Sequence, residues 1–323
     1  HKQNNSIYKK LVENQNPYVK KQPENWKDIP LVSTELFKTH KLFCLEEKQI
    51  TKKFFSSGTS STQRSTHYLS AEELRLYEAS LWQTFSKAFN LQAQRPINYL
   101  VLTETPEQLP NSSLVHMFET VKNKLNIQAN CYFVDNEKVQ IEKLENHLKE
   151  INKNLTTLVV GTAFSFVNWV DASSYKFNLP SNFMVMETGG YKGRSREVPK
   201  KDLYELISQK LGVPQQNIIG QYGMSELGSQ FYDLNVQETN QSEQRLKHIP
   251  AWCKVRILNP ENLQKEMPLQ ENGLIAIYDL CNMDSMPFVL TGDIGQKINE
   301  TCFEILGRAN KLTPKGCSLM ING

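Results

Sequence analysis

The chain has 323 residues, 39% of them hydrophobic and 22% charged, enough apolar sequence to bury the core of one large or two medium domains. The net charge is +3, and the lysines are scattered among acidic residues, so we do not expect nucleic acid to be the main partner. Apolar runs fall short of the roughly 18 to 20 residues that span a bilayer, and the polar start does not resemble a signal peptide.

The six cysteines contain neither a C-x-x-C pair nor a neighbouring histidine pair. This spacing predicts neither a zinc site nor a disulfide framework, and it favours a reducing, cytoplasmic location.

Residues 1–50 alternate weak helical patterns with proline-bounded turns, and we expect them to form a helical lead-in. A hydroxyl-rich stretch, residues 54–66 (FFSSGTSSTQRST), follows an aromatic pair that closes a strand. Ser70 then matches a helix N-cap, and Glu73, three residues on, completes the capping-box pattern. The helix that follows has apolar residues at helical spacing: Leu74, Tyr77, Leu81 and Phe85.

From residue 97 onward, short apolar strands alternate with helices. The expected strands are residues 97–102, 129–134, 156–162, 184–187 and 218–222. The expected helices are residues 112–125, 142–152 and 201–211, the last of which should stop at Gly212. Strands that alternate with helices of this length imply crossover connections and a mostly parallel sheet.

From about residue 245 the pattern becomes β-rich, with short strands separated by Pro, Asn and Gly turns. We therefore predict an α/β fold in which a large, mostly parallel sheet is flanked by helices and joined by a smaller antiparallel β-rich C-terminal subdomain. The predicted segments are the helical lead-in 1–50, the α/β core 51–244 and the β-rich subdomain 245–323.

Several loops have the chemistry of a phosphate site. The loop at residues 56–59 offers backbone N–H and hydroxyl groups, and Gly58 permits an unusual backbone angle, so an anion such as phosphate fits it. A solvated Ser/Thr turn is the alternative. In open α/β sheets, ligands sit outside the carboxyl ends of the strands. The loops that follow residues 55, 188 and 222 are therefore expected to converge on one crevice.

Three later motifs extend this chemistry. In residues 222–226 (YGMSE), the glycine allows a turn, the Ser225 hydroxyl can reach a phosphate oxygen, and the Glu226 carboxylate is a hard ligand for Mg²⁺. In residues 290–293 (LTGD), Asp293 can accept hydrogen bonds from ribose hydroxyls. Arg308, in the sequence LGR, supplies a cation for phosphate or ribose.

In this order the motifs resemble those of the adenylate-forming superfamily, which activates carboxylic acids with ATP. The resemblance implies the fold of that superfamily's N-terminal domain. It also implies ATP-binding roles for residues that match the phosphate, adenine, aromatic-Gly-x-Thr-Glu, ribose and hinge motifs: Ser56, Ser57, Gly58, Thr59, Gly189, Gly190, Tyr222, Gly223, Ser225, Glu226, Asp293 and Arg308. Ser225 stands in place of the usual threonine, and Ser61 in place of the second glycine of the phosphate loop.

A closer resemblance is to the acyl-protein synthetases of bacterial fatty-acid reductase complexes, carried by residues 187–197 (ETGGYKGRSRE), 222–233 and 316–319 (GCSL). It implies that a fatty acid reacts with ATP and Mg²⁺ to give an acyl-adenylate and pyrophosphate. The acyl group would then pass to the thiol of Cys317, from which a partner such as a reductase, acyltransferase or carrier protein takes it. Lys315 nearby favours the thiolate form, whereas a small buried hydrophobe is the alternative role for Cys317.

Other roles stay open at this level. The acyl acceptor could instead be coenzyme A or an acyl carrier protein, or the chain could be a nucleotide-binding subunit without turnover. Larger superfamily members carry a catalytic lysine on a further C-terminal domain; here only Lys311 and Lys315 are nearby, so either this family works without that lysine or the chain is truncated. The run 159–169 either lines an acyl tunnel or is core, and four residues of the 187–197 stretch either clamp phosphate or face solvent: Tyr191, Lys192, Arg194 and Arg196.

Overall fold

The computed structural model describes residues 4–15, 23–56, 64–174, 176–177, 179, 182–191, 193–233 and 245–309. By its internal contacts the chain divides into two compact units. We call one the β unit; it comprises His1–Ser80, Met224–Ser229 and Leu246–Gly323. We call the other the α/β unit; it comprises Leu81–Gly223 and Gln230–Arg245. The division into segments 1–50, 51–244 and 245–323 stays a prediction.

The α/β unit is built on a five-stranded sheet with the order β10-β9-β8-β7-β4. Its strands are β4 (Asn98–Leu102), β7 (Thr157–Thr162), β8 (Phe183–Thr188), β9 (Ile218–Tyr222) and β10 (Phe231–Tyr232). Neighbours among β4, β7, β8 and β9 run parallel, and the short edge strand β10 is antiparallel to β9. The mostly parallel sheet expected from the alternation of strands and helices is therefore confirmed.

The strand expected at residues 129–134 is wrong. Tyr132 forms only an isolated parallel bridge with Val101, and the chain then enters a small hairpin of β5 (Val134–Asp135) and β6 (Lys138–Val139). The turn residues Asn136 and Glu137 have φ values of 48° and 63°. Two successive residues with positive φ form the tight turn of a hairpin, and Val134, the last residue of the expected strand, therefore pairs with Val139.

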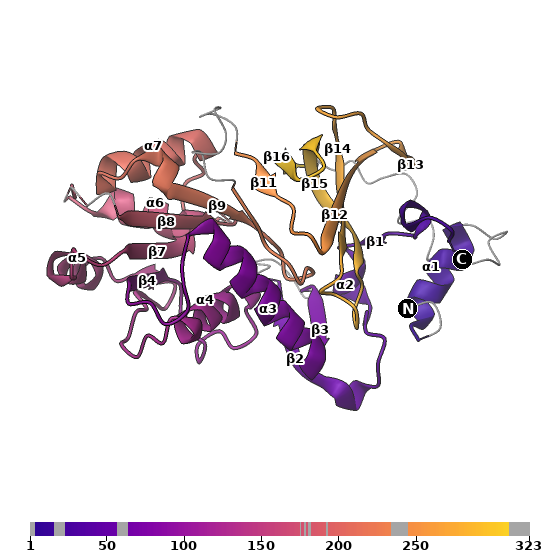
Figure 1. Ribbon diagram of the computed structural model, residues 1–323, viewed down its shortest axis with the longest axis horizontal. Helices are drawn as coiled ribbons and strands as arrows, with labels where there is room; N and C mark the ends of the chain where they lie inside the picture. Colours follow the sequence, from indigo (N-terminus) through magenta and orange to yellow (C-terminus); the bar gives the residue numbers. More distant parts are fainter. Residues whose placement is uncertain are drawn as a thin grey trace. The chain divides into compact units, whose positions relative to one another are not determined.

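Helices cover both faces of this sheet (Figure 1). One face packs against α5 (Ile141–Glu150), α6 (Ala163–Ala172) and α7 (Lys200–Leu211) in one large apolar cluster. The other face meets α4 (Ser113–Lys124), where the Tyr99 hydroxyl donates to the Phe118 carbonyl at 3.3 Å. The sheet faces alternate as side chains of a strand must: Leu100 and Leu102 belong to the α5–α7 cluster, whereas Tyr99 points to α4.

Helix ends in the α/β unit follow the local sequence signals. The Ser112 hydroxyl accepts from the Val115 N–H at 3.3 Å, as an N-cap serine does. Gly212 ends α7 with a φ of 70°, a left-handed conformation that costs glycine little. The apolar run 159–169 is packed in the core cluster, with Phe166 and Trp169 both 0% exposed, which supports the core alternative for that run.

The β unit contains a seven-stranded sheet with the order β11-β16-β15-β14-β12-β13, to which β1 adds a parallel pairing with β15. Its strands are β1 (Val32–Ser33), β11 (Lys247–His248), β12 (Cys253–Asn259), β13 (Asn262–Glu266), β14 (Asn272–Asp279), β15 (Phe288–Asn299) and β16 (Cys302–Arg308). All pairings from β11 to β16 are antiparallel, so the predicted antiparallel, β-rich part is confirmed.

The rest of the β unit is N-terminal. A hairpin of β2 (Ile50–Phe55) and β3 (Thr66–Ser70) leads directly into α3 (Ala71–Ala88), a helix whose first ten residues belong to this unit and whose remainder belongs to the α/β unit. The shorter helices are α1 (Ser6–Gln15), α2 (Leu36–Thr39) and the 3-10 turns η1 (Trp26–Asp28) and η2 (Glu47–Gln49); η3 (Gln215–Asn217) precedes β9. Within the described ranges, no helix combines the length and apolarity needed to cross a membrane.

Ser70 caps α3 as predicted, because its hydroxyl oxygen accepts from the Glu73 N–H at 3.1 Å. The reciprocal half of the capping box is wrong. The Glu73 carboxylate accepts instead from the Ser285 hydroxyl at 3.0 Å. A buried carboxylate needs donors, and the folded chain supplies one from a residue 212 positions away.

Candidate active site

The predicted phosphate loop begins beside the YGMSE segment. The Ser225 hydroxyl donates to the carbonyl oxygen of Phe55 at 3.3 Å, at the end of β2. The next residue, Ser56, is tied to Ser65 by two bonds of 3.0 Å, one from each backbone N–H. These bonds close the base of the loop, and they place Ser56 next to Ser225. Ser57, Gly58 and Thr59, together with Ser61, lie outside the described residues.

The backbone of Ser225 and Glu226 is held by side chains from other parts of the β unit. His67 Nδ1 lies 2.8 Å from the carbonyl oxygen of Ser225, and Asn282 Nδ2 donates to the carbonyl oxygen of Glu226 at 2.7 Å. Glu226 itself is buried, with 6% of its surface exposed. Sequence reasoning missed His67 and Asn282, because nothing local to them marks a partner more than fifty positions away.

Ser229, three residues after Glu226, is anchored to a buried carboxylate. The N–H and hydroxyl of Ser229 both donate to Asp279, each at 2.8 Å, and the Cys281 N–H donates to the same carboxylate at 2.9 Å. Burial raises the pKa of Asp279, and the hydrogen bonds from Ser229 and Cys281 oppose that rise. Residues 224–229 are therefore fixed at both ends within the β unit.

Asp293 and Arg308 face each other across β15 and β16, where they are register partners. Arg308 Nε lies 3.6 Å from Asp293 Oδ1, and the Arg308 side chain is 90% exposed. Such an exposed ion pair contributes little to stability. The Asp293 backbone is fixed more firmly, since its N–H donates to Thr291 Oγ1 at 3.2 Å and that hydroxyl donates to Ile275. The structure thus brings the predicted ribose and hinge residues together.

The remaining motif residues lie in the α/β unit at the carboxyl edge of its sheet. β8 and β9 are parallel neighbours with Thr188 opposite Gln221, so Gly189 and Gly190 follow one strand beside the Tyr222 and Gly223 of the other. Gly189 has a φ of 79°, and among the described residues no atom lies within 4 Å of a Cβ built at either glycine. Open space at the ends of parallel strands is where ligands of α/β sheets bind.

A group of polar and charged side chains lies behind this edge: Glu187, Tyr204 and Asp233 are buried, and the Lys200 side chain is 46% exposed. The Tyr204 hydroxyl donates to Glu187 at 3.0 Å, Lys200 Nζ lies 3.6 Å from the same carboxylate, and Asp233 accepts from the Gly220 N–H at 2.7 Å. Partial desolvation opposes the charge on the half-exposed Lys200 side chain, but Glu187 and Asp233 outweigh it and raise the Lys200 pKa. The first two contacts connect α7 to β8, and the third connects β9 to the residue after β10, so together they brace the edge.

The two described cations of the 187–197 stretch, Arg194 and Arg196, are paired with carboxylates of the same unit. Arg196 makes two bonds of 2.8 Å to Asp171, and Arg194 Nη2 lies 2.8 Å from Glu137. The Tyr191 hydroxyl donates to the Val198 carbonyl at 2.7 Å. Lys192 lies outside the described residues.

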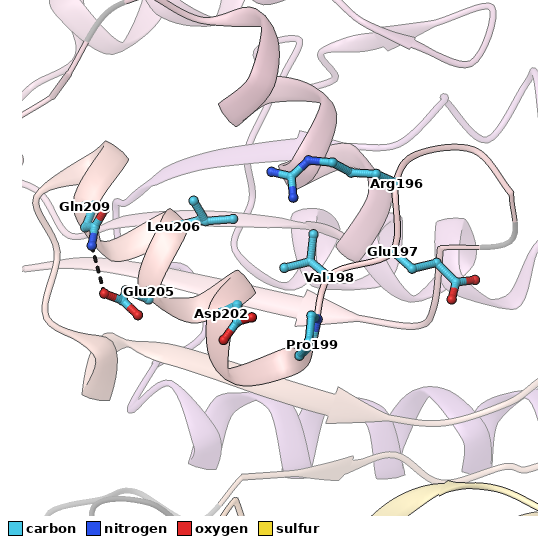
Figure 2. A pocket seen from close by; sticks show the side chains of 8 residues that line it. All are labelled: Arg196, Glu197, Val198, Pro199, Asp202, Glu205, Leu206 and Gln209. Carbon is cyan, nitrogen blue, oxygen red and sulfur yellow. Dashed lines mark hydrogen bonds between the residues drawn. The ribbon is translucent and has the colours of Figure 1, made fainter.

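A shallow hollow of about 380 Å³ lies beside this stretch, lined by residues 196–199 and by the exposed side of α7 (Figure 2). Gln209 donates to Glu205 across its rim at 2.9 Å. Arg196, which could clamp phosphate, lines the hollow, but none of the described residues with a predicted ATP-binding role does.

The described cysteines are all buried. Burial is the leading cause of a raised pKa at each of them: to about 11 at Cys44 and Cys281, to about 12 at Cys131, and upward at Cys253 and Cys302. Such thiols are poor nucleophiles near neutral pH. Cys317, like Lys311 and Lys315, lies outside the described residues.

This fold is similar to that of solved adenylate-forming enzymes. ATP-bound MatB from Rhodopseudomonas palustris aligns with 82% of this chain at a TM-score of 0.54 and 15% identity. The luciferase-like enzyme of the nonluminescent mealworm Zophobas morio aligns with 84% of this chain at a TM-score of 0.55 and 15% identity. The aligned part is 49% and 60% of those chains, so this chain spans about half the length of the solved structures it matches. At this identity the likeness concerns the fold.

The family follows from the sequence of the whole chain. Residues 1–323 match the family described as acyl-protein synthetase, LuxE, and the chain belongs to that family of ligases. It is 25% identical over 310 residues to the long-chain-fatty-acid–luciferin-component ligase of Aliivibrio fischeri, covering 90% of this chain and 77% of that protein. The Vibrio harveyi protein of the same name is 22% identical over 336 residues, and this match covers 100% of this chain and 84% of that protein. The predicted family and fold class are confirmed.

Proposed function

We propose that this protein activates a long-chain fatty acid with ATP and transfers the acyl group to its own Cys317. A carboxylate oxygen of the acid attacks the α-phosphorus of ATP, the bond to pyrophosphate breaks, and an acyl-adenylate forms. The Cys317 thiolate then attacks the acyl carbon, AMP leaves, and a thioester remains. A partner such as a reductase, acyltransferase or carrier protein would remove the acyl group.

The observation that carries the first step is the bond between Ser225 and Phe55. It joins the YGMSE segment to the start of the hydroxyl-rich loop, so that two segments with phosphate-binding chemistry meet in one unit. The register pairing of Asp293 with Arg308 adds a carboxylate and a cation on β15 and β16, also in the β unit. Phosphoryl transfer depends mainly on positioning and on neutralising charge, and these residue types supply both.

The donor set fits Mg²⁺ held chiefly by substrate phosphates. Within the described ranges, no group of three or more His, Cys, Asp or Glu residues is placed to hold a metal. Mg²⁺ bound through one or two carboxylates and the phosphates of a nucleotide needs no such group, and the buried Glu226 is the candidate carboxylate. When bound, Mg²⁺ would neutralise charge on the phosphates, while His67 and Asn282 keep the Glu226 segment oriented.

The assignment of Cys317 as acceptor is supported by the state of the other cysteines. Each of the five described thiols is buried and has a raised pKa, which disfavours the thiolate needed for attack. Cys317 is the remaining cysteine of the chain, and Lys315 lies two positions before it.

Intact-mass spectrometry after incubation with ATP, Mg²⁺ and a series of fatty acids tests this proposal. We expect an acyl adduct that hydroxylamine removes and that maps to Cys317, together with pyrophosphate release that requires the acid. Cys317→Ser should abolish the adduct and preserve acid-dependent exchange of pyrophosphate into ATP. Cys302→Ser is the matched control, because its hydroxyl can keep the contact that Cys302 makes with Asn299.

The outcomes separate the possible acceptors. Acid-dependent pyrophosphate exchange with no adduct would remove Cys317 as acceptor and point to coenzyme A or a carrier protein. Absence of both signals from the wild-type protein would refute the ligase reaction itself and favour a nucleotide-binding subunit without turnover.

A further inference from the structure

His67 is a completely buried residue of the β unit that lies between the backbone of Ser225 and the hydroxyl of Ser285. It is 0% exposed on β3, with Nδ1 at 2.8 Å from the Ser225 carbonyl and Nε2 at 2.8 Å from the Ser285 hydroxyl. Ser285 in turn donates to Glu73 Oε1 at 3.0 Å. The result is a continuous chain of hydrogen bonds from Glu73, at the start of α3, to the backbone of Ser225.

The hydrogen count fixes the direction of the bond between His67 and Ser225. A carbonyl oxygen only accepts, so Nδ1 of His67 must carry a proton. If Glu73 is ionised, the single Ser285 proton goes to Glu73, and Nε2 must donate to Ser285. If Glu73 is protonated, it donates to Ser285, whose proton then goes to Nε2. In both arrangements the Nδ1–H donates to Ser225.

Residues 223–230, which receive the bond from His67, are held in place by side-chain hydrogen bonds of this kind. Residues 223–230 lie between β9 and β10 and contain no helix or strand, so no regular ladder fixes their carbonyl groups. The Ser225 and Glu226 carbonyls are oriented by His67 and Asn282, and the Leu227 N–H turns back to the Met224 carbonyl at 3.2 Å. Rotation of the peptide between Ser225 and Glu226 would move both residues at once.

We propose that His67 is a positioning residue for the Ser225 and Glu226 segment, with Ser285 and Glu73 holding its ring. The inference rests on the proposed function, since it assumes that this segment binds the phosphates of ATP. His67 touches neither ATP nor the fatty acid in this scheme. It acts by keeping one carbonyl, and with it the direction of two neighbouring side chains, in place before ATP binds.

Two substitutions of His67 distinguish the role of its Nδ1–H as a hydrogen-bond donor to Ser225 from the role of its ring in packing. Asn carries its amide nitrogen near the place of Nδ1, so His67→Asn keeps a donor for Ser225. Gln carries its amide nitrogen near the place of Nε2, so His67→Gln keeps the contact with Ser285 and loses the donor for Ser225. Ser285→Ala is a milder variant that keeps His67 and releases its ring.

Pyrophosphate exchange into ATP, measured as a function of MgATP and of fatty acid, is the first readout. We expect His67→Gln to raise the KM for MgATP about tenfold, equivalent to about 1.4 kcal/mol, with the KM for fatty acid unchanged. His67→Asn should stay within about threefold of wild type. Ile277→Ala, a cavity variant of the buried residue on β14, is the control: loss of folded protein lowers the rate and leaves the KM for MgATP unchanged.

Hydrogen exchange of the peptide containing residues 224–229, followed by mass spectrometry without ligand, is the second readout. We expect at least tenfold faster exchange in His67→Gln, a smaller increase in Ser285→Ala, and near-normal exchange in His67→Asn. Equal behaviour of the Gln and Asn variants, or normal exchange in His67→Gln, would overturn the proposal whether or not the protein turns over. If the wild-type protein shows no pyrophosphate exchange but hydrogen exchange of residues 224–229 is still faster in His67→Gln, the proposed function is refuted and the positioning role is supported.

Discussion

Gly228→Ala is the substitution whose effect the structure specifies most directly. A Cβ at this position would lie 2.7 Å from Asn282 Oδ1, 2.8 Å from Cys281 Cβ and 2.9 Å from the Cys281 carbonyl carbon. These atoms are poorly able to retreat. The Cys281 N–H is bonded to Asp279, and the Asn282 amide holds the Glu226 carbonyl. The added methyl group must therefore displace the segment that carries Ser225 and Glu226.

The cost follows from the distances. The contact with Cys281 Cβ must lengthen by about 0.6 Å to reach ordinary van der Waals separation, and an overpacked methyl group in a rigid site typically costs about 1 to 3 kcal/mol. For a unit of this size, a loss of about 2 kcal/mol lowers Tm by roughly 4 to 8 °C. The same displacement should weaken MgATP binding more than fatty-acid binding.

Gly292→Ala is the matched control for this prediction. Among the described residues no atom lies within 4 Å of a Cβ at Gly292, so we expect its Tm to stay within about 1 °C of wild type. Circular dichroism melting gives the two shifts, and pyrophosphate exchange gives the KM for MgATP. A Gly228→Ala protein that melts with the wild type would refute the idea that the segment is rigidly held by Cys281 and Asn282.

Three further predictions concern other parts of the chain. Iodoacetamide at pH 8 should modify Cys317 in the native protein and spare Cys131, whose pKa burial raises to about 12; rapid native labelling of Cys131 would contradict this. Arg196 lowers the pKa of Asp171 in the folded protein. The stabilisation from this ion pair is therefore complete above 3.8, the pKa of the unfolded carboxyl group, and is lost as the pH falls through the lower folded pKa. Because the pair is half exposed, Asp171→Asn should cost at most about 1 kcal/mol of stability at pH 7 and nothing in strong acid. Phe166→Ala should cost about 3 to 5 kcal/mol in chemical denaturation, whereas a change in acyl-chain preference without loss of stability would revive the tunnel role of residues 159–169.

Much of the fold was predictable because its signals are local. The start of α4 is marked by Ser112, and the end of α7 by Gly212, through hydrogen bonds and backbone angles that involve only neighbouring residues. The parallel order of β4, β7, β8 and β9 follows from strands that alternate with helices, since a parallel connection requires a crossover. The strand expected at residues 129–134 is reduced to the bridge between Tyr132 and Val101, and its last residue, Val134, pairs instead with Val139 in the β5–β6 hairpin.

The motif residues could be found in the sequence because their order resembles that of a known family, and the family is confirmed over the whole chain. Their individual roles stay predictions. What a pattern in the sequence cannot specify is the partner of a buried polar group. Glu73 looks like half of a capping box, yet its carboxylate serves Ser285, and His67 carries no motif at all although it orients Ser225.

The amino-acid sequence by itself determined most of the helices and strands, the mixed α/β character and the family of this protein, because periodicity, caps and motifs depend on neighbouring residues. Only the tertiary structure decided which groups meet. Ser225 reaches Phe55 across 170 positions and His67 reaches Ser225 across 158. Burial removes water from such groups, so each must find a partner inside the fold, and that partner is set by the packing of the whole β unit.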